Sequence, residues 1–217
     1  MKYEQERSEV ARFALEMEER GLTQFTSGNV SKRVPEGAII TPSTMPYADI
    51  RPEDCVLMDL EGNVLEGERQ ASVEHKVHLA CYKHRESVQG VIHSHPLYAT
   101  AFAAARVPLP AFLDEFGVYV GAEVRCAEYA MSGSPDIAEN LVKALSDDTN
   151  AAFIASHGMV TVGRSLDEAM RVARMVERAA QIFLYARILG AIVEPPEESK
   201  TLFRQVFSYF QSQPPPA

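Results

Sequence analysis

Segments with the apolar spacing of strands alternate with segments of helical spacing along nearly the whole chain. Apolar side chains recur every three to four residues over 4–20 and 165–190, as they do on one face of an α-helix. Short apolar runs typical of buried strands occupy 37–43, 88–95 and 151–163. Because helices and strands alternate, the pattern predicts an α/β or α+β fold.

The remaining segments extend this pattern. They are a turn-rich stretch at 23–34, a hairpin at 55–65, helices at 72–84, 96–107 and 134–146, and one or two strands within 117–130. Ser134 is expected to cap the last of these helices. A length of 217 residues without an internal repeat or linker fits one large domain. We therefore expect a single domain over 1–217, with a tail that frays over about 212–217.

The composition excludes several kinds of partner. A net charge of −9 without a basic cluster argues against binding nucleic acid. No run of about 18 apolar residues occurs, so no membrane span is expected. The three cysteines are widely spaced and form no CxxC pair, which suits a reducing compartment. We expect a cytoplasmic protein.

Two histidines one residue apart, His93 and His95, end the apolar run VQGVI. Side chains at i and i+2 of a strand point to the same face, with Cα atoms about 6.6 Å apart, so both imidazoles can bind one ion. The candidate third ligand is His157, which follows AAFIAS and precedes Gly158. Three protein ligands and an open position are typical of catalytic Zn²⁺. From spacing alone, structural histidines remain the alternative.

Glu74 stands on the first turn of the helix expected at 72–84. A carboxylate beside a metal can be a ligand, a proton shuttle, or both in turn. His75 and His78 offer a competing metal pair at i, i+3 on the same helix, which ranks lower because no third ligand lies nearby in the sequence.

Loops of small residues precede several of these elements, with TSGNV at 26–30, TPST at 41–44 and Ala-Ser at 71–72. Their backbone N–H groups and hydroxyls can bind an anion. Loops of this composition are usually plain turns, so each is a weak signal by itself.

In sequence order, TSGNVS at 26–31, ITPSTMPY at 40–47, SVE at 72–74, HSH at 93–95 and HG at 157–158 resemble the motifs of the class II aldolase/adducin-head family. The resemblance covers about residues 8–190 and includes the long C-terminal helix. It implies a three-layer αβα fold with a central, largely antiparallel sheet. It also implies a C4 homotetramer whose active site lies near subunit contacts.

The resemblance also implies the site. Zn²⁺, or another divalent metal such as Mn²⁺ or Co²⁺, would be held by His93, His95 and His157. Glu74 matches the catalytic acid/base, which can also ligate the metal in the resting enzyme. The positions expected to bind the substrate phosphate are Gly28, Asn29, Ser43, Thr44 and Ser72.

The implied reaction is that of an aldolase, most like the family members that act on L-fuculose 1-phosphate. A ketose 1-phosphate is cleaved reversibly between C3 and C4 into dihydroxyacetone phosphate and a small aldehyde. The metal acts as a Lewis acid on the ketose oxygens, and Glu74 protonates the carbon left by cleavage. A small sugar phosphate is therefore the expected partner, rather than nucleic acid or a membrane.

The chain departs from the pattern of the aldolase at several positions. Thr44 stands where the aldolase has glycine, and Val73 where it has a second serine. Asp114 and Glu115 occur where the aldolase has a tyrosine, so they are candidate accessory residues. Tyr209 is the candidate for a second tyrosine near the C-terminus. The metal chemistry is therefore better supported than the exact sugar.

Two alternatives remain. One is a 4-epimerase or dehydratase of the same family that acts on a pentulose phosphate. The epimerase fits less well, because epimerases of the family tend to carry aspartate at the position of Glu74. The other alternative is a non-catalytic, adducin-like interaction module, which the complete set of three histidines and Glu74 argues against.

Overall fold

Eight strands form one sheet in the computed structural model, which describes residues 1–213. The strand order is β4-β3-β2-β1-β5-β8-β7-β6, and every neighbouring pair is antiparallel except β6 and β7. The strands are β1 (Asn29–Val34), β2 (Gly37–Ile40), β3 (Val56–Met58), β4 (Val64–Glu66), β5 (Gly90–Ser94), β6 (Cys126–Ala127), β7 (Ala151–Ile154) and β8 (Gly158–Gly163). The expected central, largely antiparallel sheet is confirmed.

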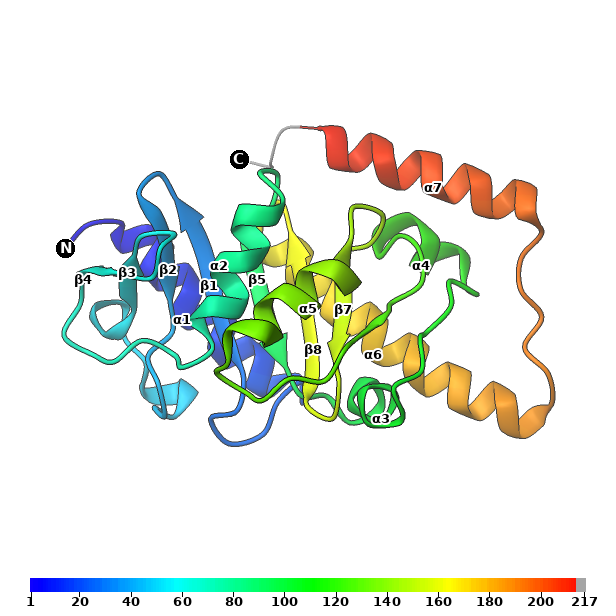
Figure 1. The fold of residues 1–217 in the computed structure, drawn as a ribbon, viewed down its shortest axis with the longest axis horizontal. Helices are drawn as coiled ribbons and strands as arrows, with labels where there is room; N and C mark the ends of the chain where they lie inside the picture. The colour runs from blue at the N-terminus through cyan, green and yellow to red at the C-terminus, as the bar shows by residue number, and fades with distance from the viewer. Residues whose placement is uncertain (214–217) are drawn as a thin grey trace.

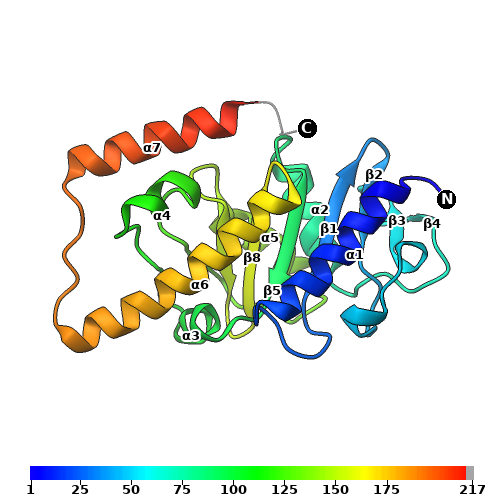
Figure 2. The same cartoon turned by 180° about the vertical axis from the view of Figure 1, so that it is seen from behind.

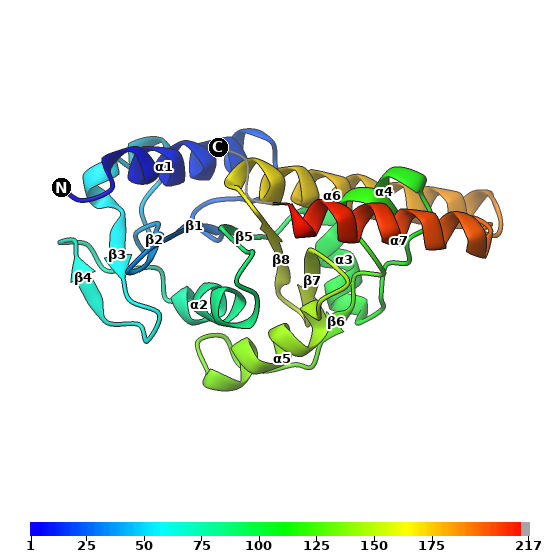
Figure 3. The ribbon, with the colours of Figure 1, turned by 90° about the horizontal axis from the view of Figure 1, so that it is seen from above.

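Helices cover both faces of this sheet (Figure 3). On one face lie α1 (Glu4–Glu19) and α6 (Leu166–Leu189), with α3 (Leu97–Ala105) packed against α6 (Figure 2). On the other face lie α2 (His75–His84) and α5 (Pro135–Leu145). The three-layer αβα arrangement, and with it the α/β class, is therefore confirmed.

The C-terminal helix α7 (Glu197–Ser212) runs along one side of the molecule and packs against α4 (Asp114–Tyr119) (Figure 1). This contact depends on Gly117, because a Cβ there would come within 2.9 Å of the Phe203 side chain. Two short 3₁₀ turns lie between β2 and β3, at Tyr47–Asp49 and Pro52–Asp54.

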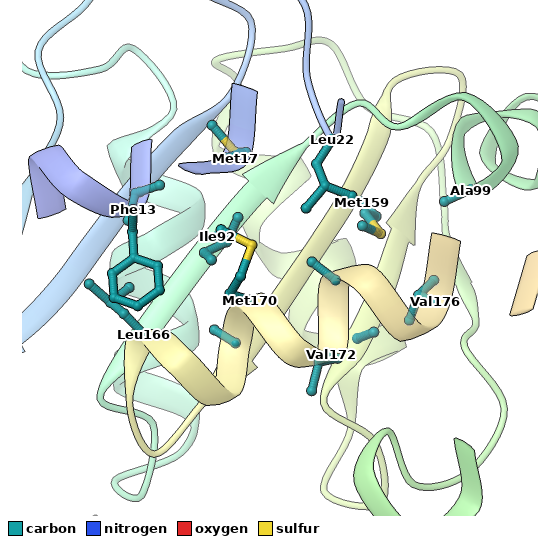
Figure 4. Close-up of a cluster of buried hydrophobic side chains, with 14 of the residues drawn as sticks. Phe13, Met17, Leu22, Ile92, Ala99, Met159, Leu166, Met170, Val172 and Val176 are labelled. Atoms are coloured by element: carbon teal, nitrogen blue, oxygen red, sulfur yellow. The ribbon is translucent and has the colours of Figure 1, made fainter. Parts of the chain in front are cut away.

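Successive residues of β5 contribute to two different hydrophobic cores, one on each face of the sheet. Ile92 belongs to the core beneath α1 and α6, together with Met17, Met159 and other apolar side chains (Figure 4). Val91 belongs to the core beneath α2 and α5. Because successive side chains of a strand point to opposite faces, His93 lies on the same face as Val91. Its imidazole is therefore directed toward the α2 layer.

The helices expected at 4–20, 72–84, 96–107, 134–146 and 165–190 are all present, apart from a few residues at their ends. The hairpin and the strands expected on either side of the histidines are present as well. Among the described residues, no helix is both long and apolar enough to cross a membrane.

One local prediction is wrong, and another holds only in part. The second half of the turn-rich stretch 23–34 is strand β1, in which polar side chains are hydrogen-bonded. Ser134 occupies the N-cap position of α5 as expected, but its side chain makes no capping hydrogen bond. Segment 117–130 holds one of the one or two expected strands, the two-residue β6, and its first residues finish α4.

The C-terminal region also differs from expectation. No pattern predicted α7, which continues to Ser212, the residue at which fraying was expected to begin. The rest of that prediction falls largely on 214–217, which lie outside the described residues.

Candidate metal centre and active site

Three imidazoles meet at the end of the central strands. His93 belongs to β5, His95 follows that strand, and His157 lies in the turn that precedes β8. The Nε2 atom of His93 lies 2.8 Å from that of His95 and 3.2 Å from that of His157. The ligand atoms of all three rings lie within 4.8 Å of one another, and no other such cluster occurs among the described residues. The sequence prediction of this trio therefore matches the geometry.

Hydrogen bonding and burial leave these ring nitrogens able to bind a cation. The Nδ1 of His93 lies 3.0 Å from the carbonyl oxygen of Met159, which can only accept. In the neutral ring, Nε2 therefore carries the lone pair. Burial, and the neighbouring His93 and His157, lower the pKa of His95 to about 3. At neutral pH His95 is consequently an uncharged potential ligand.

The turn between β7 and β8 brings His157 to the cluster. Ser156 adopts a left-handed conformation with φ 59°, and Gly158 follows His157. A Cβ at Gly158 would lie 2.6 Å from the Ser94 carbonyl oxygen and 2.8 Å from the His95 ring. Only glycine therefore allows β8 to approach β5 this closely at the metal cluster.

Glu74 completes the cluster from the start of α2. The residue occupies the N-cap position and is only 7% exposed. Its Oε2 lies 3.2 Å from His93 Nε2, and its Oε1 lies 3.1 Å from His157 Nε2. Burial opposes the ionisation of Glu74, but electrostatic interaction with His93 and hydrogen bonding with the neighbouring side chains outweigh burial and lower the pKa of Glu74.

The chemistry of these groups fits a divalent metal. Neutral imidazole nitrogens and a carboxylate are electron-pair donors. They converge here with too few N–H groups for every lone pair to accept a hydrogen bond. Glu74 Oε1 is buried and has no hydrogen-bond partner among the described residues. Three nitrogens and one carboxylate oxygen are a ligand set that Zn²⁺ and similar ions accept.

A pocket of about 250 Å³ opens beside this cluster. It is lined by Thr26, Ser27, Gly28, Asn29, Pro42, Ser43, Thr44, Ser72, Val73, Glu74, His95, Ser132 and His157. All five residues expected to bind phosphate are therefore gathered there, with Glu74 and two of the three histidines.

Three polar residues of this pocket were not among the predicted site residues. Thr26 and Ser27 belong to the quoted TSGNV loop, so the motif itself contained that signal. Ser132 comes from the loop between β6 and α5, and no nearby sequence pattern indicated it. Its position depends on the fold of a segment distant in sequence.

The loops around the pocket are fixed by backbone contacts. The Ser72 N–H donates to the Thr41 carbonyl oxygen, and the Ser43 N–H donates to the Gln70 carbonyl oxygen. Thr44 adopts a left-handed conformation with φ 57°. This conformation is available to glycine without the cost that a Cβ brings, so the threonine is a strained choice at this position.

The proposed accessory residues lie elsewhere in the chain. Asp114 and Glu115 begin α4, where Glu115 forms an ion pair with Arg178 of α6. Tyr209 lies on α7 and is 62% exposed. None of these three lines the pocket within one chain.

The competing metal pair on α2 is also separated. The His78 ring contacts Asn29 and Ser31, whereas His75 Nδ1 lies 2.9 Å from the Ser72 carbonyl oxygen. These two histidines therefore do not converge on one ion.

Comparison with known proteins agrees with this fold. The model of the class II aldolase and adducin N-terminal domain family matches residues 8–184. The chain belongs to this family. Because the family is metal-dependent and the similar proteins are aldolases, the chain is a lyase with a histidine cluster that could bind the metal.

The relatives span nearly the whole chain. A 5-deoxy-D-ribulose 1-phosphate aldolase from Bacillus thuringiensis is 32% identical, over 97% of this chain and 100% of the relative. An L-fuculose phosphate aldolase from Escherichia coli K12 is 33% identical, over 82% and 84%. A solved L-fuculose 1-phosphate aldolase structure has a TM-score of 0.89 at 35% identity, covering 94% and 96%.

Proposed function

We propose that this protein is a divalent-metal-dependent aldolase that reversibly cleaves a ketose 1-phosphate into dihydroxyacetone phosphate and a small aldehyde. One observation carries the proposal: a cluster of three imidazoles and a carboxylate opens onto a pocket lined by hydroxyl-bearing loops. The cluster suits metal chemistry, and the loops suit a phosphate. The names of relatives that act on sugar phosphates add support.

His93, His95 and His157 would hold the metal, with Glu74 as a further ligand in the resting enzyme. Zn²⁺ is the proposed ion, because three neutral imidazoles with an open position suit it, although Mn²⁺ or Co²⁺ can occupy similar ligands. When bound, the ion would supply Lewis-acid polarisation of the ketose carbonyl.

Glu74 is the proposed proton carrier. During cleavage the C4 hydroxyl gives its proton to the ionised Glu74 carboxylate as the aldehyde forms, and the bonding electron pair remains with C3. The Glu74 carboxyl group then gives that proton to C3, which completes dihydroxyacetone phosphate. In the direction of synthesis the carboxylate removes that proton. Its place at the pocket wall and its contacts with His93 and His157 support this role.

The substrate phosphate is proposed to bind in the same pocket as Glu74. Asn29, Ser43, Thr44 and Ser72 offer side-chain donors along one pocket, and Gly28 leaves room for the backbone to approach an anion. The two relatives are named for different sugar substrates, one for fuculose phosphate and the other for 5-deoxyribulose 1-phosphate. Both kinds of substrate carry the same phosphate-bearing end, which this pocket would hold.

Assembly and location complete the proposal. We propose a homotetramer in which Asp114, Glu115 and Tyr209, which lie outside the pocket of their own chain, are available to a site at a subunit contact. A cytoplasmic location is supported by three unpaired cysteines among the described residues.

A product assay on metal-loaded protein tests the function. The panel comprises L-fuculose 1-phosphate, L-rhamnulose 1-phosphate, 5-deoxy-D-ribulose 1-phosphate and L-ribulose 5-phosphate. The proposal expects dihydroxyacetone phosphate and an equal amount of aldehyde from at least one 1-phosphate. An epimer of L-ribulose 5-phosphate, or a dehydrated product without aldehyde, would favour the epimerase or dehydratase instead.

A further inference from the structure

A chain of buried hydrogen bonds begins at Glu74 and leads away from the pocket. The Asn29 Nδ2 donates to Glu74 Oε2 at 2.9 Å, and Asn29 Oδ1 lies 2.6 Å from His78 Nε2. On the other side of the ring, His78 Nδ1 lies 2.7 Å from Ser31 Oγ, which lies 2.8 Å from the Tyr82 hydroxyl. The four residues beyond Glu74 are at most 4% exposed. Each bond therefore forms without competition from bulk water.

The carboxylate sets the direction of every bond in this chain. Ionised Glu74 can only accept, so Asn29 must present its NH₂ group there and its oxygen to His78. His78 must then carry its hydrogen on Nε2, which leaves Nδ1 as an acceptor for the Ser31 hydroxyl. The Ser31 oxygen in turn accepts from Tyr82. All four bonds therefore donate toward Glu74, and one neutral tautomer of His78 satisfies them.

Secondary structure aligns the members of this network. Glu74, His78 and Tyr82 follow one another at intervals of four residues, so they lie along one side of α2. Asn29 and Ser31 are alternate residues of β1 and therefore share the sheet face that α2 covers. The hydrogen bonds thus tie the start of α2 to β1, next to the metal cluster.

We infer that His78 is a positioning residue that acts through Asn29 to hold the Glu74 carboxylate in its reactive orientation. Without the Nε2–H donor, the Asn29 amide is free to turn and present its oxygen to Glu74, where two acceptors would repel. Asn29 also lines the phosphate pocket, and only one hydrogen of its NH₂ group is used by Glu74. The inference rests on the proposed function, because Glu74 is the proton carrier there.

A double-mutant cycle tests the inference with His78→Leu, Asn29→Ala and their combination. We expect His78→Leu to retain the metal and lower kcat by about 10- to 100-fold, the scale of a misplaced catalytic group. In the Asn29→Ala background, the same change should have little further effect, because the path to Glu74 is already broken. His78→Gln offers a donor and an acceptor on one planar group, so it should restore most of the lost rate.

Two further variants separate positioning from folding. Leu79→Ala removes a buried apolar side chain from the same helix without touching the network, so it should lower stability but leave kcat near that of the parent. If His78→Leu does not fold, Ser31→Ala replaces it in the cycle, with an expected loss of about 3- to 10-fold.

The outcomes distinguish this inference from the proposed function. A parent protein that releases no dihydroxyacetone phosphate from any sugar phosphate overturns the function, and the inference with it. An active parent whose rate is unchanged by His78→Leu overturns the inference alone. The inference is also overturned if the losses in kcat of His78→Leu and Asn29→Ala add in the double variant, or if His78→Gln recovers no activity. Either result would mean that His78 has only a structural role.

Discussion

The Glu74 side chain is held by three neighbouring groups, so a substitution of similar shape should keep its position while removing its ability to transfer a proton. Asn29 donates to one oxygen, while His93 and His157 lie 3.2 and 3.1 Å away. We expect Glu74→Gln to keep the fold and much of the metal but to lower kcat by about 10²–10⁴-fold, because an amide cannot carry the proton. Product release and elemental analysis measure the two effects. A kcat near that of the parent would move proton transfer elsewhere, with Glu115 the first candidate.

Val73 lines the proposed phosphate pocket at the position where the aldolase pattern has a second serine, and 58% of its surface is exposed. A serine at this position adds one hydroxyl donor. A hydrogen bond to a charged group contributes about 1.5–3 kcal/mol, so Val73→Ser should tighten phosphate binding by roughly 10- to 100-fold. The comparison is KM for a ketose 1-phosphate and for the free ketose, in both proteins. An unchanged preference for the phosphate ester would mean that Thr44 already supplies the missing donor.

The site could be predicted from sequence where its members follow strand spacing or stand at turns. His93 lies in β5 and His95 follows that strand two residues later, and Gly158 marks the close approach that brings His157 in. Ser132 could not be predicted in this way, because its loop reaches the pocket only after the whole sheet has formed. His78 had a signal, but its helical spacing indicated a metal pair instead of a hydrogen-bond network.

At the scale of elements, the β7–β8 turn positions one metal ligand. A Cβ at Gly158 would contact the Ser94 carbonyl oxygen and the His95 ring within 2.8 Å. We therefore expect Gly158→Ala to displace His157 and weaken metal binding by at least tenfold, as measured by titration of the metal-free protein. Gly21→Ala is the matched control. It introduces a side chain at φ 68° where nothing lies within 4 Å, so it should cost about 1 kcal/mol of stability and leave metal affinity unchanged. Equal metal affinity in both variants would contradict this role of the turn.

Strand β1 shows why an element in the middle of a sheet can be missed. Its sequence NVSKRV has few apolar residues, and positions 31–33 are all polar. Ser31 is satisfied by the His78 network, Lys32 by Glu9, and Arg33 by the Val88 carbonyl oxygen. Each partner comes from a distant part of the chain. Local patterning therefore predicts a loop, while tertiary hydrogen bonds stabilise a strand.

At the scale of the whole molecule, apolar side chains are exposed where α6 extends beyond the sheet (Figure 1). Ile188 and Leu189 are 80% and 90% exposed, and Val193 follows at 87%. Such a patch is typical of a protein interface. We expect a tetramer of about 96 kDa, four times the 24.0 kDa of one chain, by light scattering after gel filtration.

Leu189→Glu should shift this tetramer toward smaller species without removing the metal, because a buried charge opposes association. Leu189→Met is the control that keeps the surface apolar. A monomeric parent would contradict the tetramer, and an intact tetramer in Leu189→Glu would place the contact on another surface.

The central claim is that metal held by the histidine cluster makes this chain an aldolase. The most direct measurement is dihydroxyacetone phosphate release by metal-stripped protein as Zn²⁺ is added back. The account predicts almost no release from the stripped parent, a rise to a plateau at about one Zn²⁺ per chain, and no such rise in a folded His95→Ala variant. Full activity in the stripped protein, or equal recovery in His95→Ala, would contradict it.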